Sequence, residues 1–316
     1  MTDWTVIRNI IRAYLPEFLK SPYRTGGTSS ARYCYAVWLR HLSMVGRSGL
    51  ATKFASVTEL GPGDSIGIGM AALLSGATRY TGLDAARLAE SSRNVAVFDE
   101  LTALFRSRAP IPDDQEYPLT RPHLPAYDFP GDILPDADLE ISLAPERLAA
   151  LRGDLSKGTD YHAPDRAVNY VAPWGPADPV APGSQDLVFS QAVLQSVSDI
   201  TTVYASMSRW LRPGGVMSHS ISMDSLGSAS RWNGHWAYSD PAWRLVNGFS
   251  GHAHAVNREP MSRHLGTIRD CGFDVVTLLT TKRADGIPRR ELAGRFRHLD
   301  DEDLLTNGFY VLARKR

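Results

Sequence analysis

Two acids and two glycines stand close together early in the chain, in an arrangement that suits the binding of a small ligand. Glu59 comes two residues before Gly61, Gly63 completes a Gly-Pro-Gly turn, and Asp84 follows the next short apolar segment. Glycine has no Cβ, so the backbone at Gly61 and Gly63 can approach a ligand where any side chain would collide. Asp84 lies at about the interval from the glycines at which an acid meets ribose hydroxyls. The types and spacing of these residues therefore indicate a binding site for a small ligand.

The glycine turn is predicted to connect a buried strand to a helix. Val57 and Leu60 belong to a short apolar run, which is typical of a buried strand. After the turn, apolar residues recur at helical spacing, at Ile66, Met70, Leu73 and Leu74. The first turn of such a helix offers free N–H groups to electronegative ligand atoms. Asp64 and Ser65 are residue types that commonly cap helices.

The spacing of the glycines distinguishes among nucleotide-binding folds. In the dinucleotide pattern G-x-G-x-x-G the third glycine would fall at Ile66, whereas this chain has Gly67, and Glu59 stands where a dinucleotide strand is normally apolar. The combination resembles the class I S-adenosylmethionine-dependent methyltransferases. In that family the acidic-x-Gly-x-Gly loop receives the methionine part of the cofactor, and the acid after the second strand binds the ribose. The family's usual third loop glycine is Ser65 here. The resemblance implies that S-adenosylmethionine is bound by Glu59, Gly61, Gly63, Ser65 and Asp84.

A second family hallmark lies later in the chain, where Leu-x-Pro-Gly-Gly occupies residues 211–215 before a hydrophobic strand. The resemblance extends over residues 52–316 apart from two insertions, and it implies an α/β fold: a Rossmann-like, seven-stranded, mostly parallel sheet with helices on both faces. It also implies that the last strand runs antiparallel between the fifth and the sixth. The chain is accordingly divided into an N-terminal helical cap, 1–50, and a cofactor-binding methyltransferase domain, 51–316, with insertions near 107–140 and 224–260.

Apolar runs place the remaining strands. The second is expected at 79–83 and the third at 167–172, followed by strands at 185–189, 216–223, 273–279 and 308–313. By the family's layout, Pro173 and Trp174 after the third strand would flank the adenine, and Ser190 and Gln191 after the fourth would lie beside the sulfonium. Trp174 suits the rim of the core equally well, since tryptophan is common in both environments.

Candidate acceptor-binding residues come from the N-terminal cap and from the insertion at 224–260. Helices are predicted at 2–20 and 29–45, and in the resembling family such helices often help to form the substrate pocket, so Tyr33 is a candidate. The insertion interleaves aromatic rings with polar groups, which suits a ring-shaped polar acceptor. Its candidate residues are Arg231, Trp232, Trp236, Tyr238, His252 and Arg258. The alternative is an insertion whose aromatic residues fill a small core of their own.

Methyl transfer would require little covalent chemistry from the protein, because the sulfonium already activates the methyl group. The acceptor must lie in line with the S–CH₃ bond with water excluded, and a hydroxyl acceptor would benefit from a nearby base. His235 and His219 are the candidate catalytic bases. The spacing of His252 and His254 suits a metal, but no third ligand accompanies them, so no metal is predicted.

Composition disfavours several classes of function. Lys plus Arg and Asp plus Glu number 34 each, so the chain lacks the excess positive charge on which general nucleic-acid binding depends. The two cysteines are far apart in sequence, which fits a reducing cytoplasm. No apolar run approaches the roughly 20 residues that cross a bilayer, and the charged N-terminal segment lacks a signal-peptide core. A cytoplasmic protein without a membrane span is predicted, and its oligomeric state is left open.

The sequence therefore predicts an enzyme that transfers a methyl group from S-adenosylmethionine to oxygen on a small polar acceptor, such as a sugar, a sugar acid or a secondary metabolite. A non-catalytic partner protein of the same fold is the alternative. A nicotinamide-dependent oxidoreductase is less favoured, because of the glycine spacing, Glu59 and the absence of a Tyr-x-x-x-Lys pair. Nucleic-acid methylation is least favoured, because no Asn/Asp-Pro-Pro-aromatic sequence follows the fourth strand.

Overall fold

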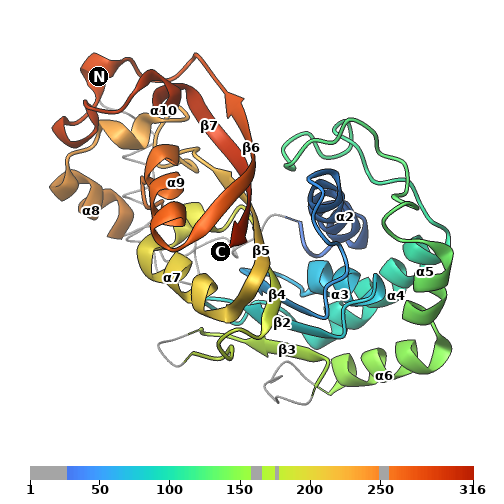
Figure 1. Cartoon of the computed structure of the whole chain (residues 1–316). Coiled ribbons are helices and arrows are strands. Elements are labelled where there is room, and N and C mark those ends of the chain that lie inside the picture. Colours follow the sequence, from blue (N-terminus) through green and yellow to red (C-terminus); the bar gives the residue numbers. More distant parts are fainter. Residues whose placement is uncertain (1–26, 158–165, 175–177, 249–255) are drawn as a thin grey trace.

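The computed structural model of the chain describes residues 27–157, 166–174, 178–248 and 256–316 (Figure 1). The helix predicted at residues 2–20 and the candidates His252 and His254 lie outside these described residues. Among the residues described, every helix falls short of the length or the apolar character that crossing a membrane requires.

A seven-stranded sheet forms the centre of the molecule, in the order β3-β2-β1-β4-β5-β7-β6. The strands are β1 (Ser56–Leu60), β2 (Arg79–Leu83), β3 (Val168–Val171), β4 (Gln185–Gln191), β5 (Leu211–Ser222), β6 (Phe273–Lys282) and β7 (Thr306–Lys315). The pairs from β3 to β5 are parallel, and β7 runs antiparallel to both β5 and β6. The predicted fold class is confirmed, including the antiparallel strand between the fifth and sixth.

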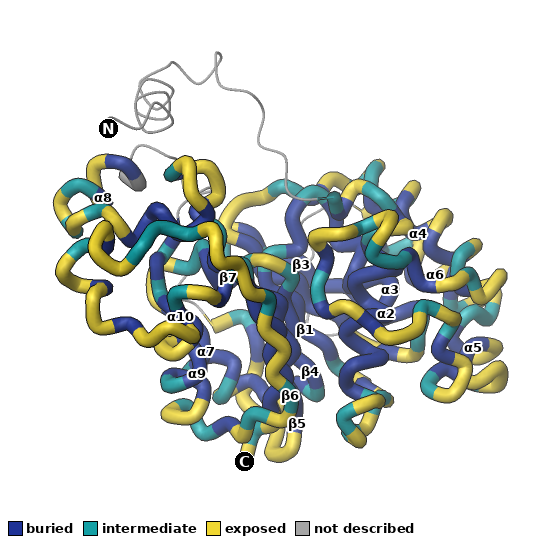
Figure 2. The backbone as a smooth tube through the Cα atoms, turned by 90° about the horizontal axis from the view of Figure 1, so that it is seen from above, coloured by how far each residue is buried: buried dark blue, intermediate teal, exposed yellow. Residues whose placement is uncertain are grey.

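Helices cover both faces of the sheet (Figure 1). One face packs against α2 (Ala31–Arg47), α3 (Gly67–Leu74), α4 (Ser91–Arg106), α5 (Asp136–Ser142) and α6 (Pro145–Ser156). The other packs against α7 (Ile200–Trp210) and α9 (Met261–Asp270), while α8 (Asp240–Gly248) and α10 (Asp301–Leu305) lie in the connections near that face. All eight residues of α3 are buried, as expected of a helix that is apolar around its whole circumference. Figure 2 shows the buried residues concentrated along the central strands and along α2 and α3.

Several element boundaries differ from the sequence-based expectation. The helix after the glycine turn begins at Gly67 with Ile66 at its N-cap position, so neither Asp64 nor Ser65 is the cap. The fifth strand begins at Leu211 rather than at residue 216, because the Leu-x-Pro-Gly-Gly segment pairs with β4 where a shift in register accommodates its irregular backbone. Element ends depend on such pairings, which local residue patterns do not encode.

The first insertion is more ordered than its proline-rich sequence indicates. It contains α5, and its irregular part packs on α2 through the fully buried side chain of Arg40. The Arg40 guanidinium pairs with Asp114 at 2.8 Å and donates to the backbone oxygens of Pro112, Thr120 and Pro122 at 2.8–3.2 Å. A buried charge is stable only when it is paired and hydrogen-bonded, so Arg40 determines where this loop lies.

Candidate functional site

The glycine turn lies at the carboxyl ends of β1 and β2. Gly61 and Gly63 have φ angles of +65° and +76°, in the left-handed region that favours glycine. The Gly61 N–H donates to the Leu83 oxygen at 2.8 Å, which joins the turn to β2. A Cβ added at Gly61 would lie 2.6 Å from Cγ2 of Val193, a residue that follows β4. Both the backbone angle and the close approach of β4 therefore require glycine here.

Asp84 holds the turn from the side of β2. Its carboxylate is 8% exposed, and Oδ2 accepts the N–H of Gly63 at 3.0 Å while Oδ1 accepts that of Ala85 at 2.7 Å. Burial raises the pKa of Asp84. The backbone N–H of Ala86 also hydrogen-bonds to this carboxylate, which leaves about one of its four lone pairs for a further hydrogen bond. Asp84 therefore retains the capacity to accept a hydrogen bond from a ribose hydroxyl.

Glu59 lies beneath the turn rather than at its surface. The side chain is 1% exposed, Oε2 accepts the hydroxyl of Tyr80 at 2.6 Å, and the carboxyl group also accepts the backbone N–H of Gly69 in α3. Burial raises the pKa of Glu59 to about 8, with the nearby Asp84 adding to the effect. Glu59 thus connects β1, β2 and the start of α3, and it acts on the turn through these elements.

Replacing Glu59 with glutamine is expected to remove part of the pH dependence of stability. The folded pKa of about 8, against 4.5 in the unfolded chain, means that only the folded state keeps this proton at neutral pH. Such a group contributes stability that is full below pH 4.5 and is lost as the pH rises through 8. Between pH 7 and pH 9 the free energy of unfolding, measured with urea, should fall by about 1.4 kcal/mol more in the wild type than in Glu59→Gln. Equal losses would mean that Glu59 is already ionised in the folded state.

Ser65 joins the turn to the segment before α2, and Tyr33 joins α2 to the first insertion. The Ser65 N–H donates to Thr28 Oγ1 at 3.2 Å, its hydroxyl donates to the Thr28 oxygen, and its Oγ accepts the N–H of Gly67 at 3.0 Å. The Tyr33 ring packs edge-on against Tyr117 of the first insertion, with ring centroids 5.5 Å apart. Ser65 therefore fixes the start of α3, and Tyr33 faces the first insertion rather than the turn.

Trp174 and Pro173 follow β3 and lie next to Asp84. The Trp174 N–H donates to the Asp84 backbone oxygen at 2.6 Å, and its half-buried ring packs on Trp210 of α7 with centroids 5.5 Å apart. Pro173 is exposed. The structure thus brings these two predicted residues to the same edge as the turn, and the Trp174 ring is partly buried against the core.

Ser190 and Gln191 at the end of β4 contact buried histidines on opposite faces of the sheet. Ser190 Oγ lies 2.8 Å from His219 Nδ1, and Gln191 Oε1 lies 3.1 Å from Nε2 of His41, a residue of α2. Burial lowers the pKa of His219 to about 3 and that of His41 to about 4. Both imidazoles are therefore neutral at pH 7, and His219, at 0% exposure, is closed off from an acceptor in this structure.

The aromatic residues of the second insertion form a packed interior. Trp232 and Trp236 are buried against the α7–α9 face, and the ring of buried His235 lies 5.1 Å from that of Trp236. Burial lowers the pKa of His235 to about 3.

The remaining candidates of the second insertion also contact other residues of the protein. The side chain of Arg258 is 3% exposed, lies over the rings of Trp243 and Phe296, and pairs with Asp240 at 2.6 Å. Exposed Arg231 donates to the backbone oxygens of Asp285 and Gly286, and half-buried Tyr238 packs on Trp243. The aromatic residues of the insertion thus pack inward, Trp232 and Trp236 on the main core and Trp243 in a small separate cluster with Val246 and Val256.

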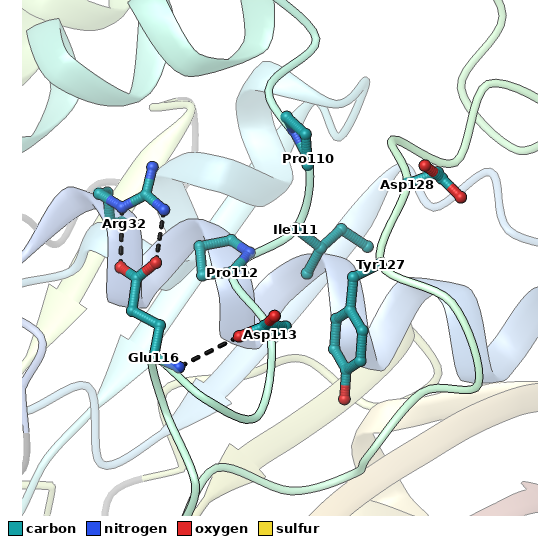
Figure 3. A pocket seen from close by; sticks show the side chains of 8 residues that line it. All are labelled: Arg32, Pro110, Ile111, Pro112, Asp113, Glu116, Tyr127 and Asp128. Carbon is teal, nitrogen blue, oxygen red and sulfur yellow. Dashed lines mark hydrogen bonds and ion pairs between the residues drawn. The ribbon is translucent and has the colours of Figure 1, made fainter.

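Two pockets lie elsewhere in the described part of the chain. One, of about 390 Å³, lies between α2 and the first insertion, where Arg32 pairs with Glu116 through two contacts of 2.8 and 2.5 Å (Figure 3). The other, of about 560 Å³, lies between the start of α9 and residues 295–303. Neither is lined by a residue that the sequence predicted as part of the site. Within the described residues, no cluster of three or more His, Cys, Asp or Glu side chains is placed to hold a metal ion.

A family model described as "Methyltransferase domain" matches residues 149–218, which run from α6 through β3, β4 and α7 into β5. The matched segment includes the Leu-x-Pro-Gly-Gly hallmark, and the last strand runs antiparallel between the fifth and the sixth, as the resemblance implied. This segment of the chain is therefore similar to methyltransferase domains, and the sheet around it has the predicted Rossmann-like fold.

Solved methyltransferase structures resemble this chain only distantly. Two S-adenosylmethionine-dependent methyltransferases, from Mesorhizobium loti and Methanosarcina mazei, share 14% and 11% identity with it, with TM-scores of 0.42 and 0.41 and coverage of 86% of this chain and 96% of theirs. A phosphoethanolamine N-methyltransferase 2 from Haemonchus contortus, solved with S-adenosyl-L-methionine, shares 14% identity over 92% of this chain and 58% of its own, with a TM-score of 0.42. No curated protein matches the sequence significantly. Likeness at this level establishes no activity.

The sequence did not indicate the residues that hold the glycine turn and its neighbours in place. Tyr80, Thr28 and Val193 contact Glu59, Ser65 and Gly61 respectively, and none of the three was a candidate. One signal was present in the sequence: Gly69 is a glycine inside a predicted helix, which usually has a packing reason. In the structure that reason is the Tyr80 ring.

Proposed function

We propose that this chain binds S-adenosylmethionine across the Gly61–Gly63 turn and catalyses transfer of its methyl group to an oxygen of a small polar acceptor. The observation that carries the proposal is the contact of 3.0 Å between Asp84 Oδ2 and the Gly63 N–H. It places the acid suited to ribose hydroxyls directly at the turn whose glycines admit a close ligand. The acceptor class is a sugar, a sugar acid or a secondary metabolite, and the acid-x-Gly-x-Gly resemblance supports the choice of cofactor.

The residues around the turn have distinct proposed roles. S-Adenosylmethionine supplies a methyl group that its sulfonium activates. Asp84 accepts hydrogen bonds from the ribose, and Gly61 and Gly63 let the backbone approach the amino-acid part. Glu59 and Ser65 hold the turn and the start of α3 in place. Pro173 and Trp174 flank the base, while Gln191 and Ser190 mark the edge of β4 nearest the reacting centre.

The chain's contribution to rate would be positional. An acceptor held in line with the transferring methyl group, with water excluded, needs little further assistance. His219 and His235 are buried and neutral, so no proton transfer is assigned to them. An acceptor oxygen that is already ionised, such as the carboxylate of a sugar acid, requires no base. Of the proposed acceptors, the sugar acid therefore fits these residues best.

Replacing Asp84 with alanine is expected to weaken binding of S-adenosylhomocysteine about tenfold to a hundredfold, since hydrogen bonds to a charged group contribute about 1.5–3 kcal/mol. Isothermal titration of the wild type and the variant measures this directly. Asp303→Ala is a matched control, because Asp303 is also buried and accepts a backbone N–H, that of Ser262 at 2.9 Å. The control should lose stability and keep its affinity. A wild type that binds neither S-adenosylmethionine nor S-adenosylhomocysteine would contradict the proposed function.

A non-catalytic protein of the same fold is the second candidate, and complete burial of both predicted bases favours it. The two candidates differ in turnover. Formation of S-adenosylhomocysteine in the presence of a panel of sugars, sugar acids and phenolic metabolites would support the enzyme, whereas cofactor binding without turnover on any acceptor would support the partner protein. The free cysteines Cys34 and Cys271 support the proposed cytoplasmic location.

A further inference from the structure

The loop after β4, residues 192–197, contacts the glycine turn from the β4 side. Val193 is the contacting residue, because a Cβ at Gly61 would lie 2.6 and 2.9 Å from its two methyl carbons. Asp84 fixes the turn from β2 through Gly63, so this loop supplies the second wall. Any movement of Val193 would change the space above Gly61.

The backbone of this loop is strained. Ala192 has a φ of +54°, and the nearby Arg258 in the second insertion has a φ of +65°, both in the left-handed region. Residues with a Cβ rarely adopt this region and remain there only when surrounding contacts determine their conformation. At Ala192 the N–H donates to the Ser220 oxygen at 2.8 Å, and the carbonyl accepts the Gln195 side-chain amide at 2.6 Å.

Asn257, next to Arg258, supplies further contacts to the same loop. Its backbone N–H donates to the Gln195 oxygen at 2.8 Å, and its side-chain Nδ2 donates to the oxygens of Leu194 and Val197 at 2.7 and 3.0 Å. Its Oδ1 accepts the N–H of Glu259 at 3.0 Å. Both amide hydrogens and the amide oxygen of the Asn257 side chain therefore take part in hydrogen bonds.

The segment that carries Asn257 is itself anchored in the second insertion. Trp236, which is fully buried, donates its indole N–H to the Arg258 oxygen at 3.0 Å. Arg258 is held by its ion pair with Asp240 and by the Tyr238 oxygen, which accepts Nη1 at 2.8 Å. A continuous set of contacts thus leads from the packed insertion through Asn257 to the loop and on to Val193 and Gly61.

We propose that Asn257 is a positioning residue for the cofactor site, which holds residues 192–197 so that Val193 packs on Gly61. The second insertion thereby sets the geometry of the glycine turn without contacting the ligand. The inference rests on the proposed function for its binding readout, but the position of the loop can be measured in the free protein.

The test compares Asn257→Ala with Asn233→Ala by hydrogen exchange and by titration with S-adenosylhomocysteine. Asn233 is a matched control, because it is fully buried in the same insertion but accepts the N–H of Ile287 at 2.7 Å, away from the loop. In the free protein, Asn257→Ala should speed exchange of the Ala192 and Ser196 amides by about tenfold, since the loop loses two of its hydrogen bonds. Its affinity for S-adenosylhomocysteine should fall by about tenfold. The control should change neither quantity.

Unchanged exchange at Ala192 and Ser196 in Asn257→Ala, or equal loss of affinity in both asparagine variants, would overturn the inference. If Asn257→Ala does not fold, Val193→Ala tests the same contact from its other end: weaker binding supports the inference and unchanged binding overturns it. If the wild type binds no S-adenosylhomocysteine, the proposed function fails, while the exchange comparison still decides whether Asn257 holds the loop.

Discussion

Replacing Gly69 with alanine is expected to lower the free energy of unfolding by about 3 kcal/mol, because the new methyl group would be forced into a packed core. A Cβ at this position would lie 1.9 Å from Cε2 of Tyr80 and 2.2 Å from its Cζ. The Tyr80 ring is fully buried and its hydroxyl donates to Glu59 at 2.6 Å, so the ring can move only by giving up that hydrogen bond. The substitution should therefore also disturb the turn that Glu59 supports.

Gly266→Ala provides the control for Gly69→Ala. Gly266 is also inside a helix, α9, but a Cβ there would meet no atom within 4 Å. Alanine is the better helix former, so this variant should gain roughly 0.5–1 kcal/mol. Urea unfolding of both proteins measures the contrast. If Gly69→Ala were as stable as the wild type, Tyr80 would not occupy the position described.

Acidification from pH 7 to pH 5 is expected to destabilise the fold by several kcal/mol. Burial is the largest cause that lowers the pKa of His41 to about 4 and of His219, His235 and His264 to about 3, against 6.5 in the unfolded chain. A lowered pKa contributes stability that is present above pH 6.5 and is lost as the pH falls towards the folded value. Between pH 7 and pH 5, each histidine should lower the free energy of unfolding by about 2 kcal/mol. Glu59, whose pKa is raised, should increase it by about 2.5 kcal/mol over the same range and so offset part of the loss.

Measurement of unfolding free energy at several pH values tests this acid sensitivity. Since a typical domain is stable by about 5–15 kcal/mol, the net loss should bring the chain close to unfolding near pH 5. His264→Gln, which keeps a hydrogen-bonding group near the Tyr204 hydroxyl, should reduce the slope of stability against pH by close to one proton between pH 4 and pH 6. A wild type equally stable at pH 5 and pH 7 would mean that these imidazoles are accessible to water in the folded state.

Local pattern was enough to locate the turn and its immediate neighbours. The apolar run ending at Leu60, the glycines at 61 and 63 and the acid at 84 are placed by spacing alone, and the structure puts them at one edge of the sheet. The resemblance predicted a seven-stranded, mostly parallel sheet with the last strand antiparallel between the fifth and the sixth, and the structure confirms both features. Boundaries were less accurate, as at β5, because strand ends depend on a partner that is distant in the sequence.

The sequence by itself determined the strand–turn–helix unit, because strand and helix periods and glycine's backbone freedom are properties of neighbouring residues. Only the tertiary structure decided which polar groups face a ligand and which are buried. Glu59 meets Tyr80 across two strands, and Asn257 meets Leu194 and Val197 from another insertion. The aromatic residues of the second insertion likewise pack inward rather than line a pocket. Burial and hydrogen-bond partners depend on which distant segments the fold brings together, and residue spacing carries no record of that.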